Sequence, residues 1–351
     1  MRVLVIGQGL AGTLASHAAL NRDWDCHVVD SGQSSASAIA AGMYNPMSFR
    51  RIVEVWDAAS HLASMKQTYT DLERMLQESL LHPLPILKRI PNAEYAEEWN
   101  RKTESLPWIE PVQSDIDILQ RFPNTPPSAG HGYGVVQGGG WLNLPHLISA
   151  WRENLISQGR FKHAHWNSAD VESTLKAGWD AVIDCRGATA ANDAAASIDI
   201  RANRGEILTL QDSPLTENRP LSAKHILNFG KWTLPICEGQ WRLGASYEWN
   251  RKDLEPTEET ANFLLDKLHT VAPDSTQLDI VRHDVGLRPV SRDRRPAVGP
   301  WPKKQGLFVF NGLGTRGVLI GPRWAHCLCD IVEGKTQPPD FVDPSRLISG
   351  L

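Results

Sequence analysis

Apolar runs that alternate with a helical pattern mark the first part of the chain. Residues 2–6, RVLVI, form a β-branched run typical of a strand buried on both faces. Residues 10–22 are rich in alanine and leucine and predict a helix. Residues 26–30, CHVVD, predict a second strand. A strand, a helix and a strand in this order predict a parallel βαβ unit.

Glycines fill the turn between the first strand and the helix. Gly7, Gly9 and Gly12 follow G-x-G-x-x-G spacing, and Asp30 ends the second strand. In a dinucleotide-binding unit such glycines allow a tight turn and close approach to a pyrophosphate, and the acid binds a ribose hydroxyl. An ordinary tight turn is the alternative. The residues predicted to bind here are Gly7, Gly9, Leu10, Ala11, Gly12, Asp30 and Ser31.

A run of small and hydroxyl residues, SGQSSASAIAAGMYNP, comes directly after Asp30. The hydroxyls of Ser34, Ser35 and Ser37 can hydrogen-bond phosphate oxygens or cap a helix. The small residues beyond them would let a flat ring approach the backbone. A flexible serine-rich loop is the alternative. The predicted binding residues of this run are Ser37, Ala41, Gly42 and Met43.

A second glycine-rich turn follows an apolar run near the end of the chain. Residues 307–310, LFVF, predict a strand, and GLGTRGVLIGP at 312–322 indicates a turn and the start of a helix. A further buried strand, within WDAVIDCRGATA, is predicted to end at another glycine, Gly187. A glycine-capped turn without a chemical role is the alternative. The residues predicted to bind here are Cys185, Gly187, Gly312, Leu313, Gly314, Thr315, Arg316, Gly317 and Val318.

The alternation of strands and helices breaks down in the middle of the chain. Residues 52–80 have the spacing of a long amphipathic helix, whereas residues 85–135 are proline-rich and irregular, with short β-like runs. A β-rich block follows. The pattern predicts an α/β fold, α+β overall, with two discontinuous domains. The predicted dinucleotide-binding domain comprises 1–85, 140–200 and 285–351, and the predicted substrate domain comprises 86–139 and 201–284.

Composition and charge are those of a soluble globular enzyme. Of 351 residues, 41% are hydrophobic and 22% are charged, and the formal net charge is −4. We find no bilayer-crossing apolar run and no signal peptide, and therefore expect a cytoplasmic protein. Basic residues cluster only at 287–296, so we expect no nucleic acid partner. Five scattered cysteines and the lack of a histidine cluster predict no metal site.

Four segments together point to a family. They are GQGLAG with Asp30, SASAIAAGMYNP, GLRPVSRDRRPAVGP at 286–300, and FNGLGTRGVLIGP. These segments resemble the flavin-dependent amine oxidoreductases of the D-amino-acid oxidase type, which include glycine oxidase and sarcosine oxidase. GGGWLN, LGASYEW and GLGTRG are also similar to the oxidase half of the bifunctional bacterial enzyme that modifies the tRNA wobble uridine. The resemblance covers nearly the whole chain except residues 85–135.

The resemblance implies FAD as the cofactor, in a Rossmann-like domain of the glutathione-reductase type. We expect noncovalent binding, because no cysteine stands where sarcosine oxidases attach the flavin. In such enzymes the flavin takes a hydride from the carbon next to a neutral amine, and the imine hydrolyses. FAD is long, so one glycine turn would hold the pyrophosphate and the other the flavin ring. The implied substrate is a small amine or amino acid, with oxygen or another carrier as electron acceptor.

Three side chains are candidates for a catalytic role. Arg288, in GLRP, matches a family position associated with substrate, and arginine suits bidentate carboxylate binding. Its alternative is membership of a solvated arginine cluster. Tyr44 is placed to face the substrate side of the flavin, and Arg316 to donate near the ring. Tyr247 is a candidate for the pocket wall, with core packing as its alternative, and Arg204 is expected to be structural.

Three other functions stay open at this point. The first is oxidation of a tRNA wobble-uridine side chain, which the GLGTRG likeness favours and the acidic net charge opposes. The second is an NAD-dependent dehydrogenase, which leaves the second glycine turn unexplained. The third is a flavin-binding protein without turnover.

Overall fold

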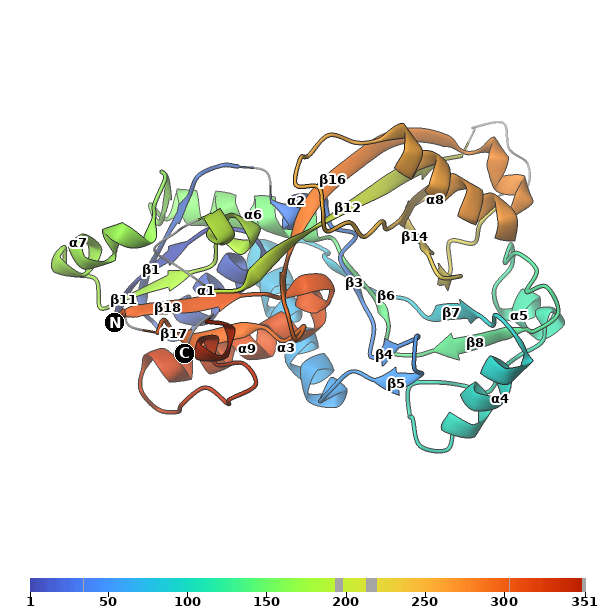
Figure 1. The fold of residues 1–351 in the computed structure, drawn as a ribbon, viewed down its shortest axis with the longest axis horizontal. Helices are drawn as coiled ribbons and strands as arrows, with labels where there is room; N and C mark the ends of the chain where they lie inside the picture. Colours follow the sequence, from blue (N-terminus) through green and yellow to red (C-terminus); the bar gives the residue numbers. More distant parts are fainter. Residues whose placement is uncertain (34, 193–197, 213–219, 303, 349–351) are drawn as a thin grey trace.

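The computed structural model describes residues 1–351 apart from 34, 193–197, 213–219, 303 and 349–351. A six-stranded sheet, in the order β10-β2-β1-β11-β18-β17, lies in one half of the molecule (Figure 1). The first five strands run parallel, and β17 is antiparallel to β18. Their bounds are β10 (Phe161–His163), β2 (Asp25–Asp30), β1 (Arg2–Ile6), β11 (Ala181–Asp184), β18 (Leu307–Asn311) and β17 (Ala297–Pro300). The predicted βαβ unit and α/β class are confirmed.

Alternate residues of the parallel strands pack on opposite faces of this sheet. Val3 and Val5 belong to the core formed with α1, α3, α6 and α9. Leu4 and Ile6 belong to the core formed with α7 on the other side. Burial of both faces explains why the strands are continuously apolar in sequence. The helix bounds are α1 (Leu10–Leu20), α3 (Ala58–Leu76), α6 (Leu144–Ser157), α7 (Val171–Lys176) and α9 (Gly317–Val332).

Helix α9 contains a proline whose missing hydrogen bond is replaced from α3. Pro322 lies inside α9 and has no N–H to donate to the carbonyl of Val318, one turn earlier. The hydroxyl of the fully buried Tyr69, on α3, donates to that carbonyl at 3.1 Å. The buried carbonyl is therefore satisfied, and α3 is tied to α9 at this point.

The helix predicted at 52–80 is shorter in the structure. Asp57 directly before α3 has φ +52° and Gln77 directly after it has φ +57°. Left-handed backbone cannot continue a right-handed helix, so both ends are fixed. The preceding residues form β5 (Val53–Glu54), which pairs with β4 (Met47–Ser48).

A seven-stranded sheet forms the other half, in the order β16-β12-β15-β14-β13-β7-β8. Helix α8 packs on one face of it, and α4 together with the chain around 41–52 packs on the other. The long strands β12 and β16 extend from this sheet into the first half (Figure 1). Their bounds are β16 (Asp279–Ser291), β12 (Ile200–Gln211), β15 (Gln240–Gly244), β14 (Trp232–Cys237), β13 (Ile226–Asn228), β7 (Ile86–Arg89), β8 (Tyr133–Val136) and α8 (Glu258–Val271). The exact domain boundaries stay a prediction.

The segment 85–135, expected to be irregular, contains two helices besides β7 and β8. The Asn92 side chain accepts a hydrogen bond from the N–H of Tyr95 and begins α4 (Ala93–Lys102). The Ser114 hydroxyl accepts from the N–H of Asp117 and begins α5 (Asp115–Arg121). These capping residues were the sequence signal that the proline content obscured.

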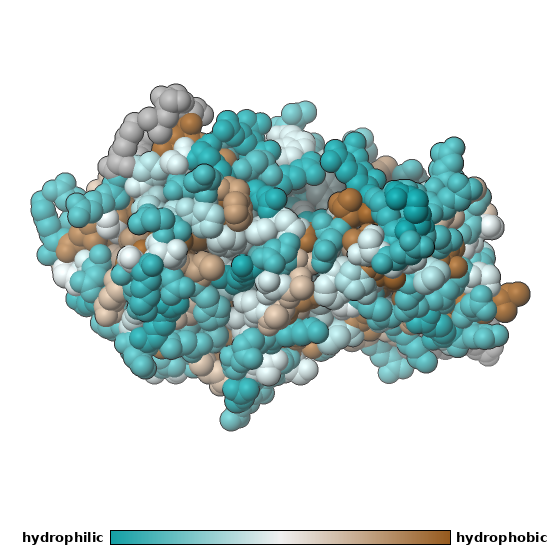
Figure 2. Space-filling view, turned by 90° about the horizontal axis from the view of Figure 1, so that it is seen from below, coloured by the Kyte–Doolittle hydropathy of each residue, from teal (hydrophilic) through white to brown (hydrophobic). Residues whose placement is uncertain are grey.

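Short elements complete the described part. Strand β9 joins β3 and β6 in a small antiparallel sheet beside the first half. Every helix in the described residues is too short or too polar to cross a membrane. The face in Figure 2 is largely hydrophilic, with apolar residues scattered among polar ones. The bounds are α2 (Ala36–Ile39), β3 (Met43–Tyr44), β6 (Leu81–Pro83), β9 (Gly140–Leu142), η1 (Ser168–Asp170), η2 (Gly187–Asn192), η3 (Pro273–Gln277), η4 (Gly314–Arg316) and η5 (Pro344–Leu347).

Replacing Gly12 by alanine tests the approach of α1 to the turn after β1. A β-carbon at position 12 would lie 1.8 Å from the carbonyl oxygen of Gly7, and backbone cannot rotate away as a side chain can. We expect Gly12→Ala to lower the free energy of unfolding by about 3 kcal/mol or more, measured by guanidinium denaturation followed by circular dichroism.

The matched control is Gly159→Ala, where no atom lies within 4 Å of the new β-carbon and φ is +66°. That change carries only the cost of a left-handed alanine, about 1 kcal/mol. Equal destabilisation by the two changes would contradict the close approach.

Candidate functional site

Three parallel strands end at one edge of the six-stranded sheet. In the pairing register, Ile6 of β1 lies opposite Asp184 of β11, which lies opposite Val309 of β18. The turns that follow these strands are therefore neighbours. A β-carbon at Gly7 would lie 2.9 Å from the carbonyl oxygen of Cys185, so the first two turns touch. Ligands of open α/β sheets bind at the carboxyl ends of such strands.

Asp30 is held by the backbone of the first glycine turn. Its carboxylate accepts hydrogen bonds from the N–H of Gln8 at 2.7 Å and of Gly32 at 2.8 Å. Nη2 of Arg152 lies 3.6 Å from the same carboxylate. Asp30 thus lies at the edge where a ribose was predicted, and Ser31 follows it. The binding roles of both residues stay a prediction.

The serine-rich run folds back onto the start of α1. The Ser37 hydroxyl accepts a hydrogen bond from the N–H of Leu10 at 3.0 Å. Ser35 caps the short helix α2 by accepting from the N–H of Ala38. Ser37 therefore lies at the positive end of α1, beside Gly9 and Leu10, where a pyrophosphate was predicted. Ala11 follows Leu10 in the first turn of α1. Ser34 lies outside the described residues.

The next predicted residues, 41–44, form the small sheet beside this turn. A β-carbon at Gly42 would lie 1.9 Å from the carbonyl oxygen of Leu142, so only glycine fits there. Ala41 and Tyr44 are buried, and Met43 is half-buried. Burial raises the pKa of Tyr44 to about 12. Tyr44 is therefore a core side chain that stays protonated, and its catalytic role stays a prediction.

The second glycine turn is tied to the neighbouring strand ends by Asn311. Its side-chain amide donates to the carbonyl of Gly187 at 2.9 Å, and its side-chain oxygen accepts from the N–H of Gly312 at 2.7 Å. Leu313 forms a β-bridge with Val290 of β16. The turn continues through Gly314, with φ +55°, into η4 and α9. Sequence reasoning missed Asn311, although a polar residue directly after LFVF was a signal.

The other residues predicted around the second turn differ in exposure. Thr315 is exposed, and Gly317 and Val318 are buried in α9. Arg316 is half-buried, and Nη1 donates to the carbonyl of Asn45 at the long distance of 3.5 Å. The structure thus brings Arg316 next to the chain that follows Tyr44.

Arg288 and Arg316 share an aromatic neighbour. The Tyr247 ring lies 4.6 Å from Cζ of Arg288. Burial lowers the pKa of both arginines, and the Tyr247 phenol opposes that change in each. Nη1 of Arg288 donates to Oδ1 of Asn203 at 3.0 Å and to the carbonyl of Ser246 at 3.2 Å. Arg288 is thus a part-buried residue of β16, and its pocket role stays a prediction.

Arg242 supports the small-residue run and was not singled out in the sequence. It is buried on β15, and Nη1 donates to the carbonyls of Ile39 at 3.1 Å and Ala40 at 2.7 Å. Burial lowers the pKa of its guanidinium. Arg242 therefore joins the seven-stranded sheet to the run beside the first glycine turn. An arginine inside the apolar alternation QWRLG was the available signal.

The described ranges contain no group of three or more His, Cys, Asp or Glu side chains arranged to hold a metal ion. The first glycine turn and the small-residue run fit a cofactor that lies against the backbone, because a side chain at Gly7, Gly12 or Gly42 would collide with a neighbouring carbonyl. At the second turn, Gly312 and Gly314 have φ +71° and +55°, a backbone conformation that favours glycine. At the first turn, the Ser37 hydroxyl and the N-terminus of α1 lie side by side.

A protein-family model described as FAD dependent oxidoreductase matches residues 2–331. The match covers most of the chain, and the chain therefore belongs to this D-amino-acid oxidase family of FAD-dependent oxidoreductases. The predicted family, enzyme class and FAD dependence are confirmed at this level.

Individual relatives show the same likeness. The tRNA 5-methylaminomethyl-2-thiouridine biosynthesis bifunctional protein MnmC of Polaromonas naphthalenivorans is 24% identical over 391 residues, covering 99% of this chain and 59% of MnmC. Glycine oxidase of Geobacillus kaustophilus is 24% identical over 368 residues, covering 97% of this chain and 94% of the oxidase. The chain thus spans less than two thirds of the length of MnmC.

The fold is shared with solved structures. The crystal structure of glycine oxidase from Geobacillus kaustophilus has a TM-score of 0.81 at 22% identity, covering 99% of this chain and 97% of the oxidase. This likeness confirms the predicted Rossmann-like fold.

Removing the Arg242 guanidinium tests whether its hydrogen bonds to the small-residue run contribute to FAD binding. Arg242→Met leaves the carbonyls of Ile39 and Ala40 without their donor, so we expect the run beside the first glycine turn to loosen. The dissociation constant of FAD from the reconstituted apoprotein should rise about tenfold or more, measured by quenching of flavin fluorescence. Arg282→Met is the control, because that arginine is exposed on the same sheet. Equal FAD affinity in the two variants would exclude this role.

Proposed function

We propose that the chain binds FAD noncovalently and oxidises a small amine or amino acid. When bound, the flavin accepts a hydride from the carbon next to the amine, and the imine product hydrolyses in water. Glycine, sarcosine and D-amino acids are the proposed substrates. Oxygen or another carrier is the proposed electron acceptor.

The orientation of Arg288 carries this proposal. All hydrogen bonds from its guanidinium to described residues leave through Nη1. Nε and Nη2, which form one edge of the planar fork, donate to none of the described residues. Such an edge is the geometry that binds a carboxylate through two parallel hydrogen bonds. Val290, close to Arg288 on β16, bridges to Leu313, which supports a carboxylate position near the second glycine turn.

The state of the cysteines supports noncovalent binding and a reducing compartment. All five cysteines are free. Burial raises the pKa of Cys26 and Cys329 to about 12, and also raises that of Cys185, which lies beside the first glycine turn. A thiol held neutral is a poor nucleophile toward a flavin. Because all five cysteines are free, as is usual in a reducing compartment, we also propose a cytoplasmic location.

A second candidate is oxidation of a tRNA side chain. The match to MnmC covers 99% of this chain, and MnmC is named for a role in tRNA 5-methylaminomethyl-2-thiouridine biosynthesis. The amine chemistry would be the same, with a macromolecular substrate in place of a small one.

Anaerobic titration of the holoprotein tests the proposal and separates its two forms. We expect glycine, sarcosine, D-proline or another D-amino acid to bleach the visible flavin absorption, because hydride transfer reduces the ring. Bleaching only by undermodified tRNA would favour the second candidate. A protein that cannot be reconstituted with FAD would contradict both.

Substitution of Arg288 tests whether its guanidinium binds the carboxylate of the substrate. We expect Arg288→Ala to retain FAD and to raise KM for the amino-acid substrate about 10- to 100-fold, the cost of losing charge-assisted hydrogen bonds. Steady-state kinetics provide the measurement. Arg282→Ala, which removes an exposed arginine from the same strand, is the control. Unchanged kinetics in Arg288→Ala would remove this residue from the site.

A further inference from the structure

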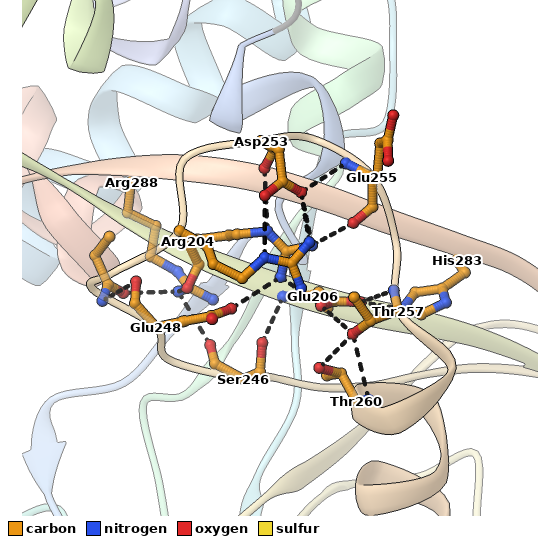
Figure 3. A network of polar contacts seen from close by, with 12 residues as sticks. Arg204, Glu206, Ser246, Glu248, Asp253, Glu255, Thr257, Thr260, His283 and Arg288 are labelled. Carbon is orange, nitrogen blue, oxygen red and sulfur yellow. Dashed lines mark hydrogen bonds and ion pairs between the residues drawn. The ribbon is translucent and has the colours of Figure 1, made fainter.

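A buried ion pair lies beside Arg288 and takes no direct part in the proposed reaction (Figure 3). The side chains of Arg204 and Glu206, on β12, are both 0% exposed, and Nη1 lies 2.5 Å from Oε1. Taking two charges out of water is costly, so a buried pair is a weak source of stability. The contacts of the pair indicate another role.

Arg204 holds one loop, residues 245–257, between β15 and α8. Its guanidinium donates to the Glu248 carboxylate at 3.1 Å, to the Asp253 carbonyl at 3.0 Å and to the Glu255 carbonyl. The main chains of Arg204 and Glu248 also exchange two hydrogen bonds, of 2.8 and 2.9 Å. The fork of one arginine therefore fixes the loop at three points along its length (Figure 3).

Glu206 holds both ends of the same loop. Its carboxylate accepts from the N–H and the hydroxyl of Thr257, at 3.0 and 2.9 Å, and its N–H donates to the Ser246 hydroxyl at 2.9 Å. Nε2 of His283 is 2.6 Å from Oε2 of Glu206, without hydrogen-bond geometry. Burial acts to raise the pKa of Glu206, but the hydrogen bonds from Thr257 and Arg204 outweigh it and lower the pKa. The carboxylate therefore stays ionised beside Arg204.

The loop places Tyr247 on Arg288. The Tyr247 ring lies 4.6 Å from Cζ of Arg288, and the adjacent carbonyl of Ser246 accepts from Nη1. On the strand, Gly205 leaves room for the guanidinium, since a β-carbon there would lie 2.1 Å from Nη2. Arg288 therefore contacts both β12 and the loop. Tyr247 is itself 60% exposed.

We propose that Tyr247 positions the Arg288 guanidinium for carboxylate binding, and that the Arg204–Glu206 pair fixes the loop that carries Tyr247. This inference rests on the proposed function, because it assigns a role toward the carboxylate bound by Arg288. An aromatic ring attracts a guanidinium and restricts its rotamers, so the fork is already aligned when a carboxylate arrives. Tyr247 is thus a positioning residue that acts through Arg288.

The first test compares two substitutions of Tyr247 in the holoenzyme. Tyr247→Ala removes the ring, and we expect KM for the amino-acid substrate to rise about 3- to 30-fold, with kcat changed less than KM. Tyr247→Phe keeps the ring and should restore KM to within about twofold of wild type. Trp249→Ala, which removes a neighbouring exposed aromatic side chain of the loop, is the control and should leave KM unchanged.

A probe without turnover separates this inference from the proposed function. Sodium acetate carries only the carboxylate, and its binding near the ring should perturb the visible spectrum of the oxidised holoprotein. We expect the acetate dissociation constant to rise in Tyr247→Ala as KM does, whereas an amine lacking a carboxylate should react equally with both proteins. Equal acetate affinity in wild type and Tyr247→Ala would overturn the role of Tyr247 alone. A wild-type spectrum that responds to neither acetate nor any amino acid would overturn the proposed function, and this inference with it.

The second test addresses the buried pair. Arg204→Lys keeps the charge but cannot reach all its partners, so we expect faster hydrogen exchange confined to residues 245–257 and a KM raised as in Tyr247→Ala. Arg201→Lys, at an exposed position of β12, is the control. Should Arg204→Lys not fold, Thr257→Val removes one hydroxyl donor to Glu206 and should give a smaller change in the same direction. Wild-type exchange in the loop of a folded variant would overturn the role of the pair.

Discussion

The contact between α1 and the turn after β1 is the constraint on which the rest of the site depends. Gly12 brings the first turn of α1 against the Gly7 carbonyl, and Gly7 packs on the carbonyl of Cys185. Because β1, β11 and β18 are parallel neighbours, fixing one strand end fixes the other two. The start of α1 and the turn before α9 thus come to one edge, although they are separated by most of the chain.

The two halves of the molecule are joined at this same edge. Strand β16 carries Arg288 and, close to it, Val290, which bridges to the second glycine turn. Arg242 reaches from β15 to the small-residue run that follows β2. The strand that carries Arg288 therefore contacts the second glycine turn, and Arg242 is hydrogen-bonded to the small-residue run beside the first. A displacement of one sheet against the other would alter the site as a unit.

Sequence patterns predicted the features that depend on local backbone needs. The tight turn after β1 requires glycines, and their spacing at Gly7, Gly9 and Gly12 was visible in the sequence. Burial of β1 on both faces requires a continuous apolar run, which was visible as well. Contacts between distant segments leave no periodic signal, which is why Asn311 and Arg242 were missed. The burial of Tyr44 was also not visible in the sequence, because a position beside a motif does not reveal whether its side chain is buried. The ends of α3 are set by the left-handed backbone of Asp57 and Gln77. Helix propensity does not reveal which residue adopts that conformation, so these ends could not be predicted from the sequence.

Arg204, Arg288 and Arg316 differ in whether a carboxylate of the protein lies beside the guanidinium, a difference that their sequence context did not reveal. Arg204 is fully buried but faces the carboxylates of Glu206 and Glu248, so its charge is compensated within the protein. Arg288 and Arg316 are part-buried, and the described acceptors around them are carbonyl and amide oxygens. Burial lowers the pKa of both guanidinium groups. An anionic ligand between them would remove that cost, whereas an anion at Arg204 would meet two carboxylates. The same residue type is therefore paired with carboxylates at one position, and at the other two its binding role stays a prediction.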